Sequence, residues 1–139
     1  MSFEFPVRVY WEDTDAGGIV FYANYLKFFE RARTEWLRSL GIHQSTLREQ
    51  TGGMFVVSET SVRYLRPARL DDELQVSARL ASAGRAALVI AQEARLRRDG
   101  SLLAEGTIRI GWVEAATLRP ARIPPSVIDV LQTSPEATP

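Results

Sequence analysis

Residues 12–41 read EDTDAGGIVFYANYLKFFERARTEWLRSLG, an acidic glycine-containing turn followed by a long amphipathic segment. From about Tyr22 onward, apolar side chains recur every three to four residues, which is the period of one face of an α-helix. The members of this stripe are Tyr25, Phe29, Ala32, Trp36 and Leu40. Gly41 stands where a left-handed cap would end the last turn. The sequence therefore predicts a helix of about five turns that starts directly after the acidic turn.

The turn carries the carboxylates Glu12, Asp13 and Asp15 and the glycines Gly17 and Gly18. Carboxylates beside glycines commonly serve as local caps, and the glycines would then simply permit the turn. A carboxylate next to a helix start can also supply a base or nucleophile, because the first helical N–H groups are free to stabilise an oxyanion. Glycines in turn let the backbone approach a ligand closely. The residues alone leave both interpretations open.

A D-x-D turn is also typical of calcium-binding loops. Counted from Asp13, the fifth position is Gly17 and the twelfth is Asn24, where a calcium loop needs an oxygen ligand and a glutamate. We therefore predict no metal site.

The composition is that of an ordinary globular chain of 139 residues, with 45% apolar residues and 17 basic side chains balanced by 17 acidic ones. We expect one domain over residues 1–132, a disordered tail over 133–139, and no nucleic-acid partner. The absence of cysteine excludes thiolate chemistry and fits a reducing compartment. Segment 1–11 lacks the pattern of a secretory signal, and no apolar run approaches the roughly 18 residues of a membrane span. We expect a cytoplasmic protein.

Alternating apolar and polar residues predict five strands, at 3–12, 54–66, 70–81, 86–97 and 102–113. Turn residues at 83–85 and 99–100 indicate hairpins between the last three strands, and weak helical patterns occupy 42–50 and 126–131. One long helix is too few for the crossovers of a parallel sheet. The economical fold is α+β, an antiparallel sheet wrapped around the helix. Some apolar residues on the outer positions predict a partner subunit: Phe55, Val57, Val89 and Leu103.

Two stretches, YWEDTDAGGIVFYANYLKFFERARTEWLR and VRYLRPARLDDELQV, resemble the signature of the 4-hydroxybenzoyl-CoA thioesterase family. Within it the chain is most similar to the acyl-CoA thioesterase branch associated with the Tol–Pal system. The resemblance covers nearly the whole chain. It implies a hot-dog fold, a five-stranded antiparallel sheet wrapped around one long central helix, in homodimers that commonly pair into tetramers. It further implies hydrolysis of acyl-CoA, or of an acyl-carrier-protein thioester, at the dimer interface without a cofactor.

The same resemblance assigns roles to particular residues. Asp15 takes the place of the catalytic aspartate, as base or nucleophile, and the backbone N–H around Tyr22 becomes the donor to the thioester carbonyl. Gly17 and Gly18 are then substrate-binding. The Tol–Pal branch commonly has histidine where this chain has Tyr22, whereas tyrosine is seen in the aromatic-acyl branch. The resemblance therefore does not define the acyl group.

Four further residues are weaker candidates. Glu30, at the edge of the apolar stripe, can reach an acyl group or pair with a neighbouring arginine. Arg33 projects from the apolar side and is expected to extend to solvent or bind a carboxylate. Arg85 stands where related thioesterases place basic residues near the CoA phosphates, although a turn arginine can simply be solvated. His43 is expected to be a surface or capping residue.

Two alternatives to a thioesterase remain at this level. A hot-dog hydratase or dehydratase would rely on an Asp and His pair, but His43 lies outside the expected place. A non-catalytic protein could use the same fold to bind acyl carriers or to act as a scaffold. The resemblance favours the hydrolase.

Overall fold

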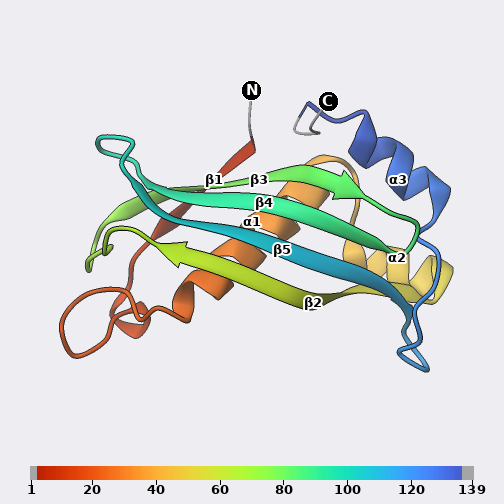
Figure 1. Cartoon of the computed structure of the whole chain (residues 1–139), viewed down its shortest axis with the longest axis horizontal. Coiled ribbons are helices and arrows are strands. Elements are labelled where there is room, and N and C mark those ends of the chain that lie inside the picture. Colours follow the sequence, from red (N-terminus) through yellow and green to blue (C-terminus); the bar gives the residue numbers. More distant parts are fainter. Residues whose placement is uncertain (1–2, 136–139) are drawn as a thin grey trace.

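The computed structural model describes residues 3–135, in which one antiparallel sheet wraps around one long helix (Figure 1). The strand order is β1-β3-β4-β5-β2. The strands are β1 (Phe3–Arg8), β2 (Gly53–Tyr64), β3 (Glu73–Ala83), β4 (Ala87–Leu96) and β5 (Leu102–Glu114). The helices are a short 3₁₀ turn (Trp11–Asp13), α1 (Asn24–Ser39), α2 (Gln44–Thr51) and α3 (Pro125–Gln132). This arrangement confirms the predicted α+β hot-dog fold, with α2 and α3 added at one end of the sheet.

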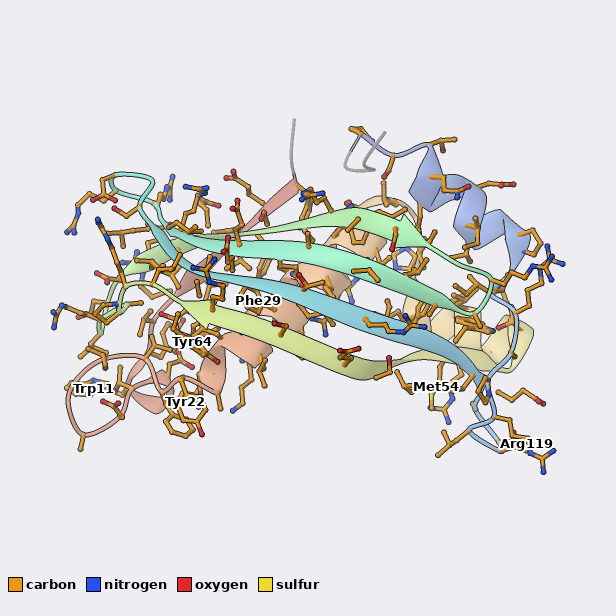
Figure 2. All side chains as sticks on the ribbon, viewed as in Figure 1. Trp11, Tyr22, Phe29, Met54, Tyr64 and Arg119 are labelled. Atoms are coloured by element: carbon orange, nitrogen blue, oxygen red, sulfur yellow. The ribbon has the colours of Figure 1, made fainter. Side chains whose placement is uncertain are left out.

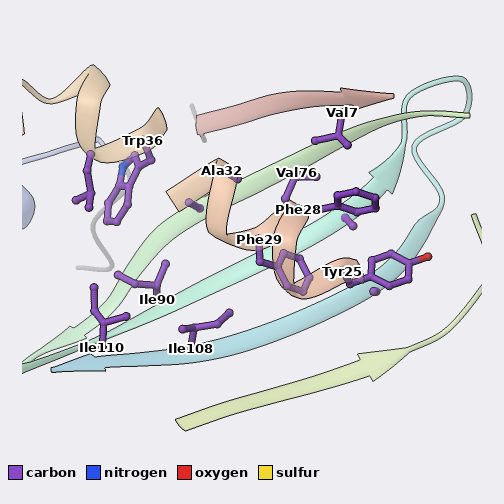
Figure 3. Packing of buried hydrophobic residues seen from close by; sticks show 14 of the residues in the cluster. Val7, Tyr25, Phe28, Phe29, Ala32, Trp36, Val76, Ile90, Ile108 and Ile110 are labelled. Carbon is purple, nitrogen blue, oxygen red and sulfur yellow. The ribbon is translucent and has the colours of Figure 1, made fainter. Parts of the chain in front are cut away.

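Helix α1 buries one face against the sheet because its apolar residues follow the helical period. The buried members are Tyr25, Phe28, Phe29, Ala32, Trp36 and Leu37. They belong to one cluster with the inward-facing residues of the strands, among them Val76, Ile90, Ile108 and Ile110 (Figure 3). Gly41, with φ of 84°, ends the helix as predicted. The helix begins at Asn24, slightly later than expected, because residues 21–24 first form a tighter turn in which the Asn24 N–H donates to the Phe21 carbonyl at 2.8 Å.

The first strand is shorter than its alternation pattern predicts. It ends at Arg8, and Trp11 lies in the 3₁₀ turn with 80% of its surface exposed. The chain turns here because the Asp13 carboxylate accepts a hydrogen bond from the Tyr10 N–H at 2.8 Å. This local bond overrides a period of two that would have continued the strand to Glu12.

The prediction that four apolar side chains lie on the outer surface is only partly correct. Val57 is 52% exposed, next to a bulge between Val57 and Glu59, whereas Phe55 and Val89 are half-buried. Leu103 is buried, so its assignment to the outer surface was wrong. The register of β5 against β4 shifts beside it, which changes the face that the strand residues occupy. β2 forms one edge of the sheet within residues 3–135.

The predicted tail lies partly outside the described residues, which exclude 136–139. Its first residues continue the hydrogen bonding of α3. The Thr133 N–H donates to the Asp129 carbonyl at 3.1 Å, and the Ser134 N–H donates to the Leu131 carbonyl at 3.3 Å. The disorder of the tail stays a prediction.

Candidate active site

The acidic turn folds back on itself as a narrow loop beside the start of α1. The Phe21 N–H donates to the Asp13 carbonyl at 2.9 Å, and the Asp15 N–H donates to the Ile19 carbonyl at the same distance. Gly18, with φ of 79°, takes the left-handed conformation at the tip. These bonds hold the carboxylates next to the residues that lead into the helix, at the end of the molecule where Figure 2 labels Trp11 and Tyr22.

Asp13 is a structural carboxylate in this loop. Only 4% of its surface is exposed, and both of its oxygens accept hydrogen bonds. The Tyr10 N–H donates to Oδ2 at 2.8 Å, and the Asn24 side-chain amide donates to Oδ1 at 2.7 Å. Since Asn24 is the first residue of α1, Asp13 ties the end of β1 to the beginning of the helix.

Asp15 has a different environment. It is exposed, and its Oδ1 accepts a hydrogen bond from the Gly17 N–H at 2.8 Å. Within residues 3–135 its Oδ2 has no protein donor. A Cβ at position 17 would lie 3.3 Å from Asp15 Oδ1, so glycine there leaves the carboxylate room. The turn orients the Asp15 carboxylate and leaves one oxygen available for chemistry.

Two consecutive backbone donors lie at the start of α1. Among the described residues, the N–H groups of Tyr22 and Ala23 have no protein acceptor. The carbonyls of the same two peptide units are both engaged: Phe21 O accepts from Asn24 N–H, and Tyr22 O accepts from the Tyr64 hydroxyl at 3.0 Å. Free N–H groups at a helix start carry the positive end of its dipole and stabilise an oxyanion.

A cavity of about 240 Å³, which Tyr22 lines, lies between α1 and the end of β2. Three tyrosines form much of it: the Tyr64 ring lies 6.1 Å from that of Tyr22 and 5.6 Å from that of Tyr25, between centroids. Burial raises the pKa of Tyr25 and that of Tyr64. The other lining residues are Ile19, Val20, Leu65, Arg66 and Pro67. Sequence reasoning missed Tyr64, whose only signal was an aromatic position in an alternating strand.

Glu30 and Arg33 lie further along α1 at a second cavity of about 150 Å³ against β2. The Arg33 Nη1 donates to Gln92 Oε1 at 3.0 Å, and the buried Gln92 amide donates to the Phe29 carbonyl. Burial lowers the pKa of Arg33, and the nearby charge of Glu30 opposes this shift. Residues 3–135 show no ion pair of Glu30 within 4 Å. Glu30 lies about 9 Å along the helix axis from Asn24. It lines this cavity and is not among the residues that line the cavity beside Tyr22.

Arg85 lies at the opposite end of the sheet from the acidic turn, in the connection between β3 and β4 (Figure 1). Its carbonyl accepts a hydrogen bond from the Ile123 N–H at 2.8 Å, which ties this turn to the segment before α3. One chain therefore does not bring Arg85 to Asp15. A contact between Arg85 and CoA stays a prediction that would require a second subunit.

The remaining predictions from the sequence concern His43, metal binding and membrane spans. His43 is exposed and precedes α2, where its carbonyl accepts from the Leu47 N–H. The described part of the chain holds no group of three His, Asp or Glu side chains that could bind a metal ion. None of its helices combines the length and apolar character that crossing a membrane requires.

Comparison with known proteins places this geometry in a family. Residues 9–131 match the family model of the thioesterase-like superfamily. The chain is 43% identical over 126 residues to the acyl-CoA thioesterase YbgC of Haemophilus influenzae, covering 91% of each chain. It is 33% identical to the acyl-CoA thioesterase YbgC of Helicobacter pylori, over 84% of this chain and 90% of that protein.

Among solved structures, a probable thioesterase from Bartonella henselae superposes with a TM-score of 0.82 at 31% identity. The match covers 89% of this chain and all of that one. The chain belongs to the thioesterase-like superfamily.

Proposed function

We propose that this chain is an acyl-CoA thioesterase that hydrolyses a thioester to a free carboxylic acid and CoA. The observation that carries the proposal is that one hydrogen-bonded loop holds both Asp15, which has one unengaged carboxylate oxygen, and the free N–H groups of Tyr22 and Ala23. A base or nucleophile beside an oxyanion site is the minimum set of groups for attack on an activated acyl carbon. The names of the relatives at 33–43% identity support the same reaction.

In the proposed mechanism, the thioester carbonyl oxygen accepts hydrogen bonds from the Tyr22 and Ala23 N–H groups. Asp15 either takes a proton from a water that attacks the acyl carbon or attacks that carbon itself. A C–O bond forms, the carbonyl oxygen becomes the oxyanion, and the C–S bond then breaks to release the CoA thiolate. If Asp15 is the nucleophile, water hydrolyses the resulting acyl anhydride. Water is the second substrate, and no cofactor takes part in this proposal.

The assembly proposed from the sequence is a homodimer, or a dimer of dimers, with the active site between subunits. The supporting feature is the free edge of β2, 12 residues long, with Val57 and Tyr64 about half exposed. Long unpaired edges are rarely left open in soluble proteins. In a dimer of this kind, the partner could supply Glu30 or Arg85. Sedimentation coupled to assay tests this: an active, folded monomer would contradict it.

The finer family assignment is also part of the proposal. We infer membership of the 4-hydroxybenzoyl-CoA thioesterase family and its Tol–Pal-associated branch, on the two sequence stretches that resemble them. A cytoplasmic location follows the expectation from the sequence, and fractionation of cells that produce the protein tests it.

A panel of short, long and aromatic acyl-CoA thioesters, with detection of the released thiol, tests the activity. We expect turnover of at least one thioester by wild-type protein. Absence of turnover across the panel by an intact oligomer would favour a protein that binds acyl carriers without hydrolysing them. Repeating the panel with acyl-carrier-protein thioesters identifies the carrier.

A further inference from the structure

The last residue of β2, Tyr64, makes a long-range hydrogen bond to the residues that lead into α1. The Tyr64 hydroxyl donates to the Tyr22 carbonyl oxygen at 3.0 Å, across 42 residues of sequence. Within residues 3–135, the other donor to this carbonyl is the Tyr25 N–H, at the longer distance of 3.4 Å. Tyr64 is therefore the nearer of the two donors to this carbonyl.

The carbonyl of Tyr22 and the N–H of Ala23 belong to one peptide unit. A donor on the carbonyl oxygen draws electron density toward oxygen and makes the N–H of that unit a stronger donor, by about 10–30% per bond in condensed-phase estimates. It also fixes the plane of the peptide, and therefore the direction in which the N–H points. The N–H in question has no protein acceptor within residues 3–135.

We propose that Tyr64 is a positioning residue for hydrolysis, which orients and polarises the Tyr22–Ala23 peptide so that the Ala23 N–H binds the developing oxyanion. This inference rests on the proposed function, because it adds to the same oxyanion site a residue that positions one of its donors. Tyr64 acts through the peptide and transfers no proton to the substrate.

The surroundings of Tyr64 keep its hydroxyl in place although the side chain is 47% exposed. Its ring packs edge-on against Tyr22 and at a tilt against Tyr25, which limits the swing of the phenol toward water. Burial, together with the neighbouring Tyr22, raises the pKa of Tyr64, so the hydroxyl keeps its proton at neutral pH.

Tyr25 offers a matched control, since it is a second tyrosine in ring contact with Tyr64. Its hydroxyl oxygen accepts a hydrogen bond from the Ala68 N–H at 3.3 Å and, within residues 3–135, makes no hydrogen bond to residues 21–24. Tyr64→Phe and Tyr25→Phe each delete one hydroxyl from the same aromatic group. Only the first deletion removes the donor from the Tyr22 carbonyl.

The experiment compares kcat, KM and melting temperature for wild type, Tyr64→Phe and Tyr25→Phe, with the acyl-CoA that the wild type hydrolyses best. For Tyr64→Phe we expect kcat to fall about tenfold with little change in KM, less than the 10²–10³-fold loss on removing an oxyanion donor itself. Tyr25 lines the same cavity, so for Tyr25→Phe we expect a lower melting temperature and a fall in kcat that is clearly smaller than in Tyr64→Phe.

A second measurement follows the peptide directly. In Tyr64→Phe, the carbonyl ¹³C resonance of Tyr22 and the amide ¹⁵N resonance of Ala23 should move, whereas Tyr25→Phe should shift them less. An unchanged kcat in folded Tyr64→Phe, or equal kinetic losses in the two variants, would overturn the inference. An inactive wild type, or an Asp15→Asn variant with normal kcat, would instead refute the proposed function.

Discussion

Asp13 and Asp15 lie two residues apart in one turn but in opposite environments. Asp13 is buried, and its oxygens accept from the Tyr10 N–H and the Asn24 amide. Asp15 is exposed, and in the described part of the chain its carboxylate accepts only from the Gly17 N–H. The loop produces this difference because its hydrogen bonds fix one carboxylate toward the helix and leave the other on the surface. A carboxylate with both oxygens bonded stabilises the fold, whereas one with a free oxygen can react.

The largest expected effect is on catalysis by Asp15→Asn. The substitution keeps the shape and the bond from Gly17 but removes the negative charge, so it abolishes a base or nucleophile. We expect kcat to fall by about 10²- to 10⁴-fold, roughly 3–5.5 kcal/mol, with KM little changed. The melting temperature should change little, because the side chain is exposed. A variant that keeps more than about a tenth of wild-type kcat would show that this carboxylate is structural.

Asp13→Asn should have the opposite profile, a larger loss of stability and a smaller loss of activity. The new amide can still accept from Asn24, but its NH₂ then faces the Tyr10 N–H and leaves a buried donor unpaired. We expect a loss of about 2–3 kcal/mol in the free energy of unfolding, measured by urea denaturation. The sequence alone does not show this burial. Activity per folded molecule should exceed that of Asp15→Asn, and the reverse order would contradict the comparison.

Tyr22→Phe should have a small effect, because the site uses the backbone of this residue. The side chain is 63% exposed, and its hydroxyl has no hydrogen bond within residues 3–135. We expect most of the activity to remain, whereas a hydroxyl that acted as an acid would make the loss about 10²-fold or more. Steady-state kinetics on the acyl-CoA that the wild type hydrolyses best distinguishes a backbone role of Tyr22 from an acid role of its hydroxyl. Tyr22→His should alter acyl preference more than rate.

The smallest effect concerns Tyr25 at alkaline pH. Burial, the largest cause, raises the pKa of Tyr25, and the bond from the Ala68 N–H opposes this shift. A raised folded-state pKa means that the contribution to stability is complete below the unfolded-state value, near 10, and is lost as pH rises through the folded-state value. We expect the melting temperature to fall above about pH 10, and more steeply in wild type than in Tyr25→Phe. Equal slopes would show that this phenol does not titrate with unfolding.

Periodicity predicted much of the fold because it reports which face of an element is buried. The alternation through Leu74, Val76 and Leu80 gave a correct strand with its inward face, and the bounds of the last four strands lie within three residues of the prediction. Periodicity failed at Trp11, where a side-chain bond to the backbone ended the strand, and at Leu103, where a shift of register changed the face. A side-chain hydrogen bond and a register shift leave no periodic pattern in the sequence, so periodicity does not predict them.

The sequence by itself determined the amphipathic helix, its glycine cap and the acidic turn before it, because these depend on contacts between near neighbours in the chain. It also named Asp15 through its resemblance to a family. Only the tertiary structure decided that Asp13 is structural, that Tyr64 meets the Tyr22 carbonyl, and that Arg85 lies at the far end of the sheet. These facts depend on which residues meet from distant parts of the chain and on which side chains become buried. A sequence does not show which of two carboxylates, or which of several tyrosines, is buried.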